Sequence, residues 1–376
     1  MNKQCSVVVV GGGFCGTMVA SRLERDSRFR VTLVTPRPHF EFTPSVPKLI
    51  ANPAYGRRIR VPFVGMLKRT HVCAGTATNV DADSVLVGDR RIPFDYLVMA
   101  TGCGYPVRLA DRRNVFTVHR GEDAERMAEG LPGAASVLVV GGGLVGVEVA
   151  AELATKSPGR RVSLVHPHDR LMDRHAKRAS HHAERFLVPR GVTIVYGERV
   201  VERDGNRFLT DTGRAIQADM AVWSTGVRPA TEFLESFITG GGSARGALAV
   251  DAGLRLVGHE NIFAGGDVTN VPEEKTAQNA QRHARVIVRN IHRHLRGQPA
   301  VVYRPRTGPL VISLGDATGI LTFKDLAWGG RMPGALKWAI EWMELARYGG
   351  ILPQPTLADV PRQTPKEIRS VKSASA

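Results

Sequence analysis

One pattern occurs twice in this chain and restricts its fold more than any other feature of the sequence. Four consecutive valines run into Gly-Gly-Gly-Phe-Cys-Gly at 11–16, and an equally apolar stretch runs into Gly-Gly-Gly-Leu-Val-Gly at 141–146. Each glycine run is followed by a helical pattern and then by a second apolar strand, at 31–34 and 162–165. Strand, glycine turn, helix and strand in this order form a βαβ unit. Because the second copy begins 130 residues after the first, the chain contains a duplicated domain rather than a short solenoid repeat.

The glycine spacing is that of a phosphate-binding turn. Gly11 allows the tight turn, Gly13 lets a pyrophosphate approach the backbone, and Gly16 lets the helix pack closely on the strand. The helix that begins there offers unpaired N–H groups to the phosphates. Two such turns predict two dinucleotides, and the simplest pair is a bound flavin with a diffusing nicotinamide. The predicted fold class is therefore α/β, with two Rossmann-like dinucleotide-binding domains, the second inserted in the first, and a C-terminal region of strands and an amphipathic helix.

Matching segments close both units and set the expected domain borders. Apolar strands at 96–99 and 221–223 each lead to a Thr-Gly turn, and a third at 262–264 leads to Gly265-Gly266-Asp267. The expected domains are an FAD-binding domain at 1–118 and 250–300, an NAD(P)H-binding domain at 119–249, a C-terminal membrane or dimer region at 301–352, and a mobile basic tail at 353–376.

Composition excludes several classes of protein. The four cysteines form no closely spaced pair and no metal-ligand pattern, so neither a disulfide scaffold nor a metal site is expected. No stretch approaches the roughly 18 apolar residues of a spanning helix, which predicts a cytoplasmic protein, peripheral on the cytoplasmic face of a membrane. The net charge of +16 suits nucleic acid, an anionic membrane surface or anionic dinucleotides. Because no nucleic-acid-binding motif is present, nucleic acid is not an expected partner.

The order of the motifs resembles that of the two-dinucleotide-binding flavoproteins over nearly the whole chain: GGGFCG, ATG, GGGLVGVEVAAEL, STGVRP and AGGD. His-Phe-Glu-Phe at 39–42 followed by Lys48, and the late Gly-x-x-Pro-Gly turn at 330–334, are similar to type II NADH dehydrogenases and to the ferroptosis-suppressor-protein, or apoptosis-inducing-factor-like, family. Disulfide reductases carry a cysteine pair that 38–53 lacks, and sulfide:quinone reductases need late cysteines, of which none follows Cys103.

This resemblance implies two sets of cofactor-binding residues. The expected FAD contacts are Gly11, Gly12, Gly13, Phe14, Gly16, Thr35, Arg37, Lys48, Ala77, Ala100, Thr101, Gly102, Gly266, Asp267, Thr276 and Ala277. The expected contacts of the nicotinamide cofactor, NADH or NADPH, are Gly141, Gly143, Gly146, His166 and Gly226. Asp267 is expected to accept hydrogen bonds from sugar or ribityl hydroxyls, although a plain turn cap would have the same sequence.

Four residues are candidates for the chemistry. By the resemblance, Glu148 lies near the nicotinamide, although an acid near a helix N-terminus needs no such role. Lys275, with the N-terminus of the helix that follows it, is expected to face the flavin. Gln278 and Arg282 lie one turn apart on one helix face, where a quinone carbonyl would find donors. Type II dehydrogenases often have Gln at both positions, so Arg282 is a departure.

Two strand ends also depart from the family pattern. The first unit has Thr35 where an acid usually binds the FAD ribose, which weakens that bond by about 1–2 kcal/mol. The second unit has His166 at the matching position, followed by His168 and Arg170. An absent acid and nearby bases predict that NADPH is tolerated or preferred.

The pattern at 333–348 predicts an amphipathic helix. Lys337, Glu341 and Glu344 form a narrow charged strip on an otherwise apolar surface, and two tryptophans lie one turn apart. Helices rich in Trp lie in membrane interfaces, so an anionic membrane surface and a quinone are the expected partners. The alternative for this helix is a core or homodimer contact. A soluble reductase of an electron-carrier protein, and an NAD(H)-responsive flavoprotein sensor, are the alternative functions.

Overall fold

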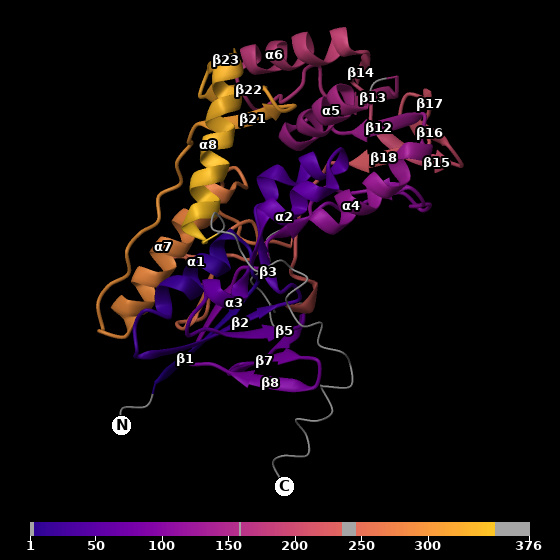
Figure 1. The fold of residues 1–376 in the computed structure, drawn as a ribbon. Coiled ribbons are helices and arrows are strands. Elements are labelled where there is room, and N and C mark those ends of the chain that lie inside the picture. Colours follow the sequence, from indigo (N-terminus) through magenta and orange to yellow (C-terminus); the bar gives the residue numbers. More distant parts are fainter. Residues whose placement is uncertain (1–3, 158, 235–245, 350–376) are drawn as a thin grey trace.

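The computed structural model describes residues 4–157, 159–234 and 246–349. Two parallel sheets lie one above the other in Figure 1, and a long C-terminal helix runs along one side of both. The predicted tail at 353–376, and the last residues of the predicted 301–352 region, lie outside the described residues.

The first parallel sheet has the strand order β20-β9-β1-β2-β5. Its strands are β1 (Cys5–Val10), β2 (Phe29–Thr35), β5 (His71–Ala74), β9 (Tyr96–Met99) and β20 (Ile262–Ala264). The four valines of β1 are all buried, as in a central strand that is covered on both faces. Helix α1 (Phe14–Leu23) begins directly after the glycine turn and packs against α7 (Ala277–His294), which comes from much later in the chain.

The second parallel sheet has the order β11-β18-β12-β13-β14. Its strands are β11 (Val115–Phe116), β12 (Ser136–Val140), β13 (Arg161–His166), β14 (Val192–Tyr196) and β18 (Met220–Trp223). The accompanying helices are α4 (Gly121–Gly130), α5 (Leu144–Lys156) and α6 (Lys177–Leu187). The chain leaves the first sheet after β9 and returns to it at β20, so the second sheet is an insertion and the predicted fold class is confirmed. The border residues of the domains stay a prediction.

The duplication extends to the backbone hydrogen bonds of the two turns. Gly11 N–H donates to Val34 O at 2.9 Å, and Gly141 N–H donates to Val165 O at 2.8 Å.

Each half also carries a small antiparallel sheet, which precedes β9 in the first half and β18 in the second. These sheets are β6 (Ala77–Val80), β7 (Ser84–Val87) and β8 (Arg90–Pro93) in the first half, and β15 (Val200–Asp204), β16 (Arg207–Thr210) and β17 (Ala215–Gln217) in the second.

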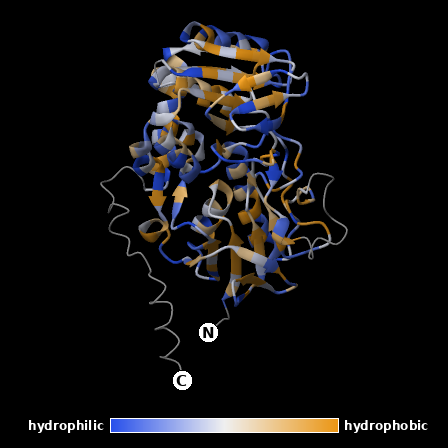
Figure 2. Ribbon diagram, turned by 90° about the vertical axis from the view of Figure 1, so that its right-hand side faces the viewer, coloured by the Kyte–Doolittle hydropathy of each residue, from blue (hydrophilic) through white to orange (hydrophobic). Residues whose placement is uncertain are grey.

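Short elements lie between these strands and helices. They are β3 (His39–Glu41) paired with β4 (Arg60–Pro62), β10 (Cys103–Gly104) paired with β19 (Arg228–Pro229), the 3-10 helices η1 (Thr43–Ile50), η2 (Pro53–Tyr55), η3 (Leu131–Gly133), η4 (Val188–Arg190) and η5 (Glu232–Leu234), and the single turns α2 (Gly56–Ile59) and α3 (Phe63–Met66). The strands of the sheets are mostly hydrophobic and the connections mostly hydrophilic, as Figure 2 shows, so the core lies along the sheets.

The C-terminal region contains one more strand than the sequence predicts. An antiparallel sheet is formed by β21 (Leu310–Leu314), β22 (Thr318–Phe323) and β23 (Leu326–Gly330), and α8 (Arg331–Arg347) follows at once. From the sequence, the strands of this region are predicted to lie within 301–323. In the structure, 301–309 form no regular element and the last strand extends to Gly330.

Helix α8 has the predicted amphipathic pattern, but its charges face inward. Lys337 and Glu341 are buried against the rest of the protein. Apolar side chains are exposed instead, with exposed fractions of 52% for Trp338 and 46% for Trp342. Met332 and Met343 are more than half exposed as well. Within the described residues, no helix has both the length and the apolar character needed to cross a membrane.

Candidate active site

The first glycine turn leaves an open cradle above a closely packed base. A side chain at Gly11, whose φ is +109°, would lie 2.2 Å from the carbonyl oxygen of Ala100. A side chain at Gly16 would lie 1.9 Å from Gly11 O. At Gly13, which precedes the first turn of α1, there is no atom within 4 Å of where a side chain would begin. The turn therefore excludes side chains below and leaves room above for a pyrophosphate on the helix N-terminus, so a dinucleotide fits.

The second turn repeats this geometry. A side chain at Gly141 would lie 2.4 Å from Thr225 Cγ2, and one at Gly146 would lie 1.8 Å from Gly141 O. Gly143 again faces open space. The turn at Gly226, with a φ of +69°, follows the neighbouring strand β18. The residues present thus fit two dinucleotides, one above each sheet.

Predicted FAD contacts lie around the first turn at the carboxyl end of its sheet. Thr35 ends β2 in a buried position, and its Oγ1 lies 2.9 Å from where a side chain on Gly12 would begin. Arg37 forms an ion pair with Glu41 at 3.4 Å. The Thr101 hydroxyl donates to Ala230 O at 2.8 Å. The remaining predicted contacts Phe14, Ala77, Ala100, Gly102, Gly266, Thr276 and Ala277 follow or begin the strands and helices that surround this edge.

A partly buried cluster lies where β20 ends. The thiol of Cys103 donates to Asp267 Oδ2 at 3.3 Å, and burial raises the pKa of Asp267. Lys275 Nζ donates to Thr269 O at 2.7 Å, and burial lowers the pKa of its ammonium despite the opposing charge of Asp267. Cys103 was not among the predicted site residues. The signal for it is its position directly after the Thr-Gly turn of the first unit.

Lys48 does not lie free beside the turn. Its Nζ donates to Glu341 Oε2 on α8 at 3.0 Å and to the Tyr55 hydroxyl at 3.2 Å. Glu341 is fully buried and also accepts from Ser45 Oγ at 2.6 Å, from the Tyr55 hydroxyl, and from Arg58 Nε at 3.1 Å. Lys48 therefore fixes α8 to the segment that is expected to cover the flavin.

Glu148 makes the matching connection from the second half. Its Oε1 accepts from Lys337 Nζ on α8 at 3.0 Å and from Ser313 N–H at 2.9 Å. Lys48 and Glu148, which come from different halves, are thus both bound to α8. Helix α8 runs along one side of both halves (Figure 1). A role of Glu148 toward the nicotinamide stays a prediction.

The two residues predicted to contact the quinone, Gln278 and Arg282, do not take part in the buried contact between α7 and α8. Gln278 is exposed beside Gly308, and Arg282 donates to Arg306 O at 3.1 Å. Gln281 is buried and donates to Glu344 Oε2 on α8 at 2.6 Å. The glutamine that faces α8 is therefore Gln281, which lies off the face shared by Gln278 and Arg282.

An acid lies near the end of β13 although the strand itself ends in His166. The Nδ1 atom of His166 accepts from Gly142 N–H at 3.0 Å, and burial lowers the pKa of the ring. Its Nε2 lies 3.4 Å from Asp173 Oδ1, and Nε2 of His168 lies 3.8 Å from Asp173 Oδ2. Arg170 donates to three backbone carbonyls of the following loop, so most of its N–H donors already have acceptors.

Among the described residues no cluster of His, Cys, Asp or Glu is suited to a metal ion.

Known proteins share this arrangement. The family model described as pyridine nucleotide-disulphide oxidoreductase matches residues 5–284. Ferroptosis suppressor protein 1 of Taeniopygia guttata is 28% identical over 329 residues, which cover 84% of this chain and 87% of that protein. This confirms the resemblance that the motifs predict.

Solved structures show the same fold at low identity. NDH2 from Plasmodium falciparum, in complex with NADH, superposes with a TM-score of 0.79 at 16% identity and covers 92% of this chain and 96% of that one. The sulfide:quinone oxidoreductase from Aquifex aeolicus has a TM-score of 0.80 at 20% identity and covers 92% of each chain. The family match and the two dinucleotide cradles show that the chain belongs to the pyridine nucleotide-disulphide oxidoreductase family and is an FAD-binding oxidoreductase that uses NAD(P)H.

Proposed function

We propose that the protein is an NAD(P)H:quinone oxidoreductase that works at the cytoplasmic face of an anionic membrane. FAD held at the first glycine turn would supply the two-electron chemistry that links oxidation of NAD(P)H to reduction of the quinone. Among the structural neighbours, the sulfide:quinone oxidoreductase uses a quinone on this fold, although this chain lacks the late cysteines that its sulfide chemistry needs.

The first role of the protein is to hold both dinucleotides at one boundary. The turn at Gly13 binds the FAD pyrophosphate, and the turn at Gly143 binds that of NAD(P)H. Asp267 accepts hydrogen bonds from hydroxyls of the flavin side chain. Lys275 and the N-terminus of α7 place positive charge at the carboxyl edge of the first sheet, where negative charge on the ring system is stabilised.

The observation that carries the quinone assignment is the orientation of α8. Its charged residues bind Lys48 and Glu148 at the boundary of the two cradles, while its apolar side chains face outward. An acceptor that approaches along α8 therefore meets Trp338 and Trp342 first. Such a surface suits an apolar quinone that diffuses in a membrane better than a charged carrier protein. The exposed Arg331 and Arg347 at the two ends of α8 suit anionic lipid.

Gln278 and Arg282 are the proposed quinone-side donors, because they begin α7 next to Lys275 and remain accessible. Gln281 is a proposed positioning residue, since it connects α7 to Glu344 of α8. A homodimer through the same apolar face is the alternative, and it would hide Trp338 and Trp342 from lipid.

The test compares acceptors on one preparation. Oxidation of NADH and of NADPH is followed with a short-tailed soluble quinone, with a long-tailed quinone in phosphatidylglycerol vesicles, with a ferredoxin-type protein, and with oxygen alone. We expect turnover with quinone about a hundredfold faster than with oxygen, a barrier difference near 2.7 kcal/mol. Faster turnover with the carrier protein would favour a soluble reductase, and slow turnover with every acceptor would favour a sensor.

A double variant distinguishes an effect on membrane binding from an effect on electron transfer itself. Trp338→Ser with Trp342→Ser should slow the vesicle-bound quinone about tenfold and leave the soluble quinone unchanged. Trp328→Ser is the matched control, because Trp328 is equally exposed but lies on β23 beside His182 of α6. Equal loss with both quinones would contradict the membrane role.

A further inference from the structure

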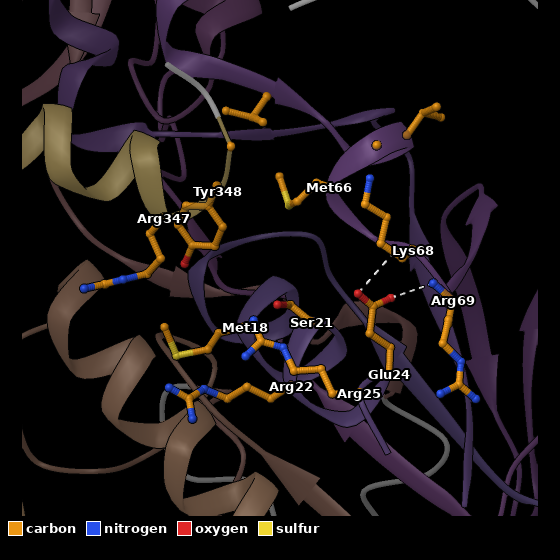
Figure 3. A pocket seen from close by; sticks show the side chains of 14 residues that line it. Met18, Ser21, Arg22, Glu24, Arg25, Met66, Lys68, Arg69, Arg347 and Tyr348 are labelled. Atoms are coloured by element: carbon orange, nitrogen blue, oxygen red, sulfur yellow. Dashed lines mark hydrogen bonds between the residues drawn. The ribbon is translucent and has the colours of Figure 1, made fainter. Parts of the chain in front are cut away.

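A cavity of about 710 Å³ lies on the first half of the molecule, away from both glycine turns. Its walls are the outer face of α1, the turn at α3 and the C-terminal end of α8 (Figure 3). Arg22 follows Gly13 by nine residues on one helix, which places it about 14 Å further along the axis. The Phe40 ring packs between Phe14 and Tyr348, with centroid separations of 5.0 and 4.3 Å. The cavity is therefore a separate site and not an extension of a dinucleotide cradle.

The inner wall of the cavity is apolar. Met18, Val61 and Tyr348 are buried and line it, and Met66 lines it from α3 with partial exposure. A cavity of this size lies within the range of about 300–1,000 Å³ that small-molecule sites have. The apolar wall suits a ligand that carries a hydrocarbon part.

The outer wall of the cavity is cationic. The lining side chains with positive charge are Arg22, Arg25, Lys68, Arg69 and Arg347. Arg347 forms an ion pair with Glu344 at 2.6 Å. Across 4–157, 159–234 and 246–349, the side chains of the other four form no ion pair. Figure 3 shows Arg22 and Arg25 below the cavity and Lys68 and Arg69 to its right, on the far side of Glu24, with the Arg22 and Arg69 side chains pointing away from each other.

The acidic lining residue, Glu24, does not neutralise these cations. Its carboxylate accepts from the backbone N–H groups of Lys68, Arg69 and Thr70 at 3.2, 3.0 and 2.9 Å, and from the Thr70 hydroxyl at 2.9 Å. The carboxylate is therefore used to fix the loop that carries Lys68 and Arg69. These contacts fix the backbone from which the Lys68 and Arg69 side chains extend.

Further positive charge surrounds this group. Arg285 and Arg289 lie one turn apart on the exposed face of α7, next to α1. Burial lowers the pKa of Arg22, and the charges of Arg285 and Arg25 lower it further. The charges of Arg22, Arg25 and Arg285 therefore repel each other in the free protein, and an anion placed beside them would reduce that repulsion. A solvated basic helix face would not converge on a cavity from three separate elements.

We propose that this cavity binds a phosphate-bearing ligand, whose phosphate oxygens are held by Arg22, Arg25, Lys68 and Arg69 and whose apolar part lies on the Met18–Tyr348 wall. Guanidinium groups bind phosphate oxygens in pairs, and the carboxylate of Glu24 in the lining is already hydrogen-bonded to the backbone of residues 68–70. The site is independent of the electron acceptor. An anionic phospholipid and a soluble phosphate compound are the two sources of this chemistry.

The experiment uses the flavin-loaded full chain and calorimetric titration at fixed ionic strength. The probes are dihexanoyl phosphatidic acid below its micelle concentration, dihexanoyl phosphatidylcholine, and inorganic pyrophosphate. The variant is Arg22→Gln with Arg25→Gln, and the control is Arg199→Gln with Arg207→Gln. The control removes the same charge from exposed arginines whose side chains have no partner among the described residues. Gln keeps good helix propensity in α1.

We expect phosphatidic acid to bind, with affinity about tenfold lower in the cavity variant and unchanged in the control. Met66→Ser should weaken phosphatidic acid and leave pyrophosphate unaffected. Pyrophosphate binding as tight as that of phosphatidic acid, with the same loss in the cavity variant, supports the site and identifies a soluble source. Equal losses in both double variants, equal binding of phosphatidylcholine, or no binding of either phosphate probe would overturn the proposal.

Discussion

At the scale of single residues, Glu341 fixes the position of α8. It accepts from donors on η1, η2 and α2 while fully buried. Glu341→Gln removes the charge that Lys48 pairs with, and an unpaired buried charge costs about 3–5 kcal/mol. We expect that loss in the free energy of unfolding at neutral pH, measured by urea titration of tryptophan fluorescence. Glu129→Gln, an exposed acid on α4, should change it by less than about 0.5 kcal/mol.

The same variant predicts a pH dependence. Burial alone would raise the pKa of Glu341, but Lys48 and the hydroxyl of Ser45 outweigh it and hold the pKa below the ordinary value of 4.5. A carboxyl whose pKa is lower in the folded state stabilises fully above its unfolded pKa and loses that effect as the pH falls through the folded pKa. The stability gap between wild type and Glu341→Gln should therefore be largest near neutral pH and narrow below 4.5. A gap that stays constant across this range would rule out the ion pair as its cause.

Asp173 is the residue on which the choice of nicotinamide cofactor depends. The sequence favours NADPH because β13 ends in His166 and no acid is adjacent, but the next loop brings the Asp173 carboxylate within 4 Å of two histidines. We propose that Asp173 repels the 2′-phosphate, so that Asp173→Asn raises kcat/KM for NADPH relative to NADH by about tenfold, or 1.4 kcal/mol. Steady-state rates with both cofactors check this. Asp169→Asn, four residues earlier in the same loop, serves as the control, and an equal change there would remove Asp173 from the explanation.

At the scale of elements, the twin glycine turns were predictable because their geometry is local. Strand, turn and helix follow within about fifteen residues, so the sequence pattern contains all the atoms that shape the cradle. The short strand β23 was not, because its pairing partner β22 and the helix packed behind it decide its structure rather than its own composition.

These turns allow a matched pair of substitutions. Gly13 and Gly143 both have negative φ and open space where a side chain would begin, so alanine is tolerated by the fold and enters the cradle. Gly13→Ala should lower the flavin content of the purified protein. Gly143→Ala should keep the flavin and raise KM for NAD(P)H about tenfold. The visible spectrum reports the flavin content of each variant, and steady-state kinetics report its KM for NAD(P)H. If Gly143→Ala lost the flavin and Gly13→Ala raised KM instead, FAD and NAD(P)H would have to be assigned to the opposite sheets.

At the scale of the whole molecule, the pairing of distant residues decides what the sequence pattern leaves open. From the sequence, the charged strip of α8 reads as a water-facing stripe, because Lys337 and Glu341 are opposite charges one turn apart that could pair with each other. Their partners, Glu148 and Lys48, lie more than 180 residues earlier, in different halves of the duplicated fold. Folding therefore turns the strip inward and the tryptophans outward, and a helix that looks interfacial by composition becomes a brace across both cradles.

This orientation of α8 predicts which tryptophans contact lipid. The chain has four tryptophans, and Trp223 is buried in β18 whereas Trp342 is 46% exposed on α8. Variants that keep a single tryptophan, with the others changed to Phe, are mixed with phosphatidylglycerol vesicles whose acyl chains carry bromine. Bromine quenches on contact, so we expect strong loss of fluorescence for Trp342 and none for Trp223, because the outward face of α8 enters the interface while the sheet stays in the interior. If α8 instead packed on a second copy of the chain, Trp342 would stay unquenched in vesicles, and its emission would shift with protein concentration.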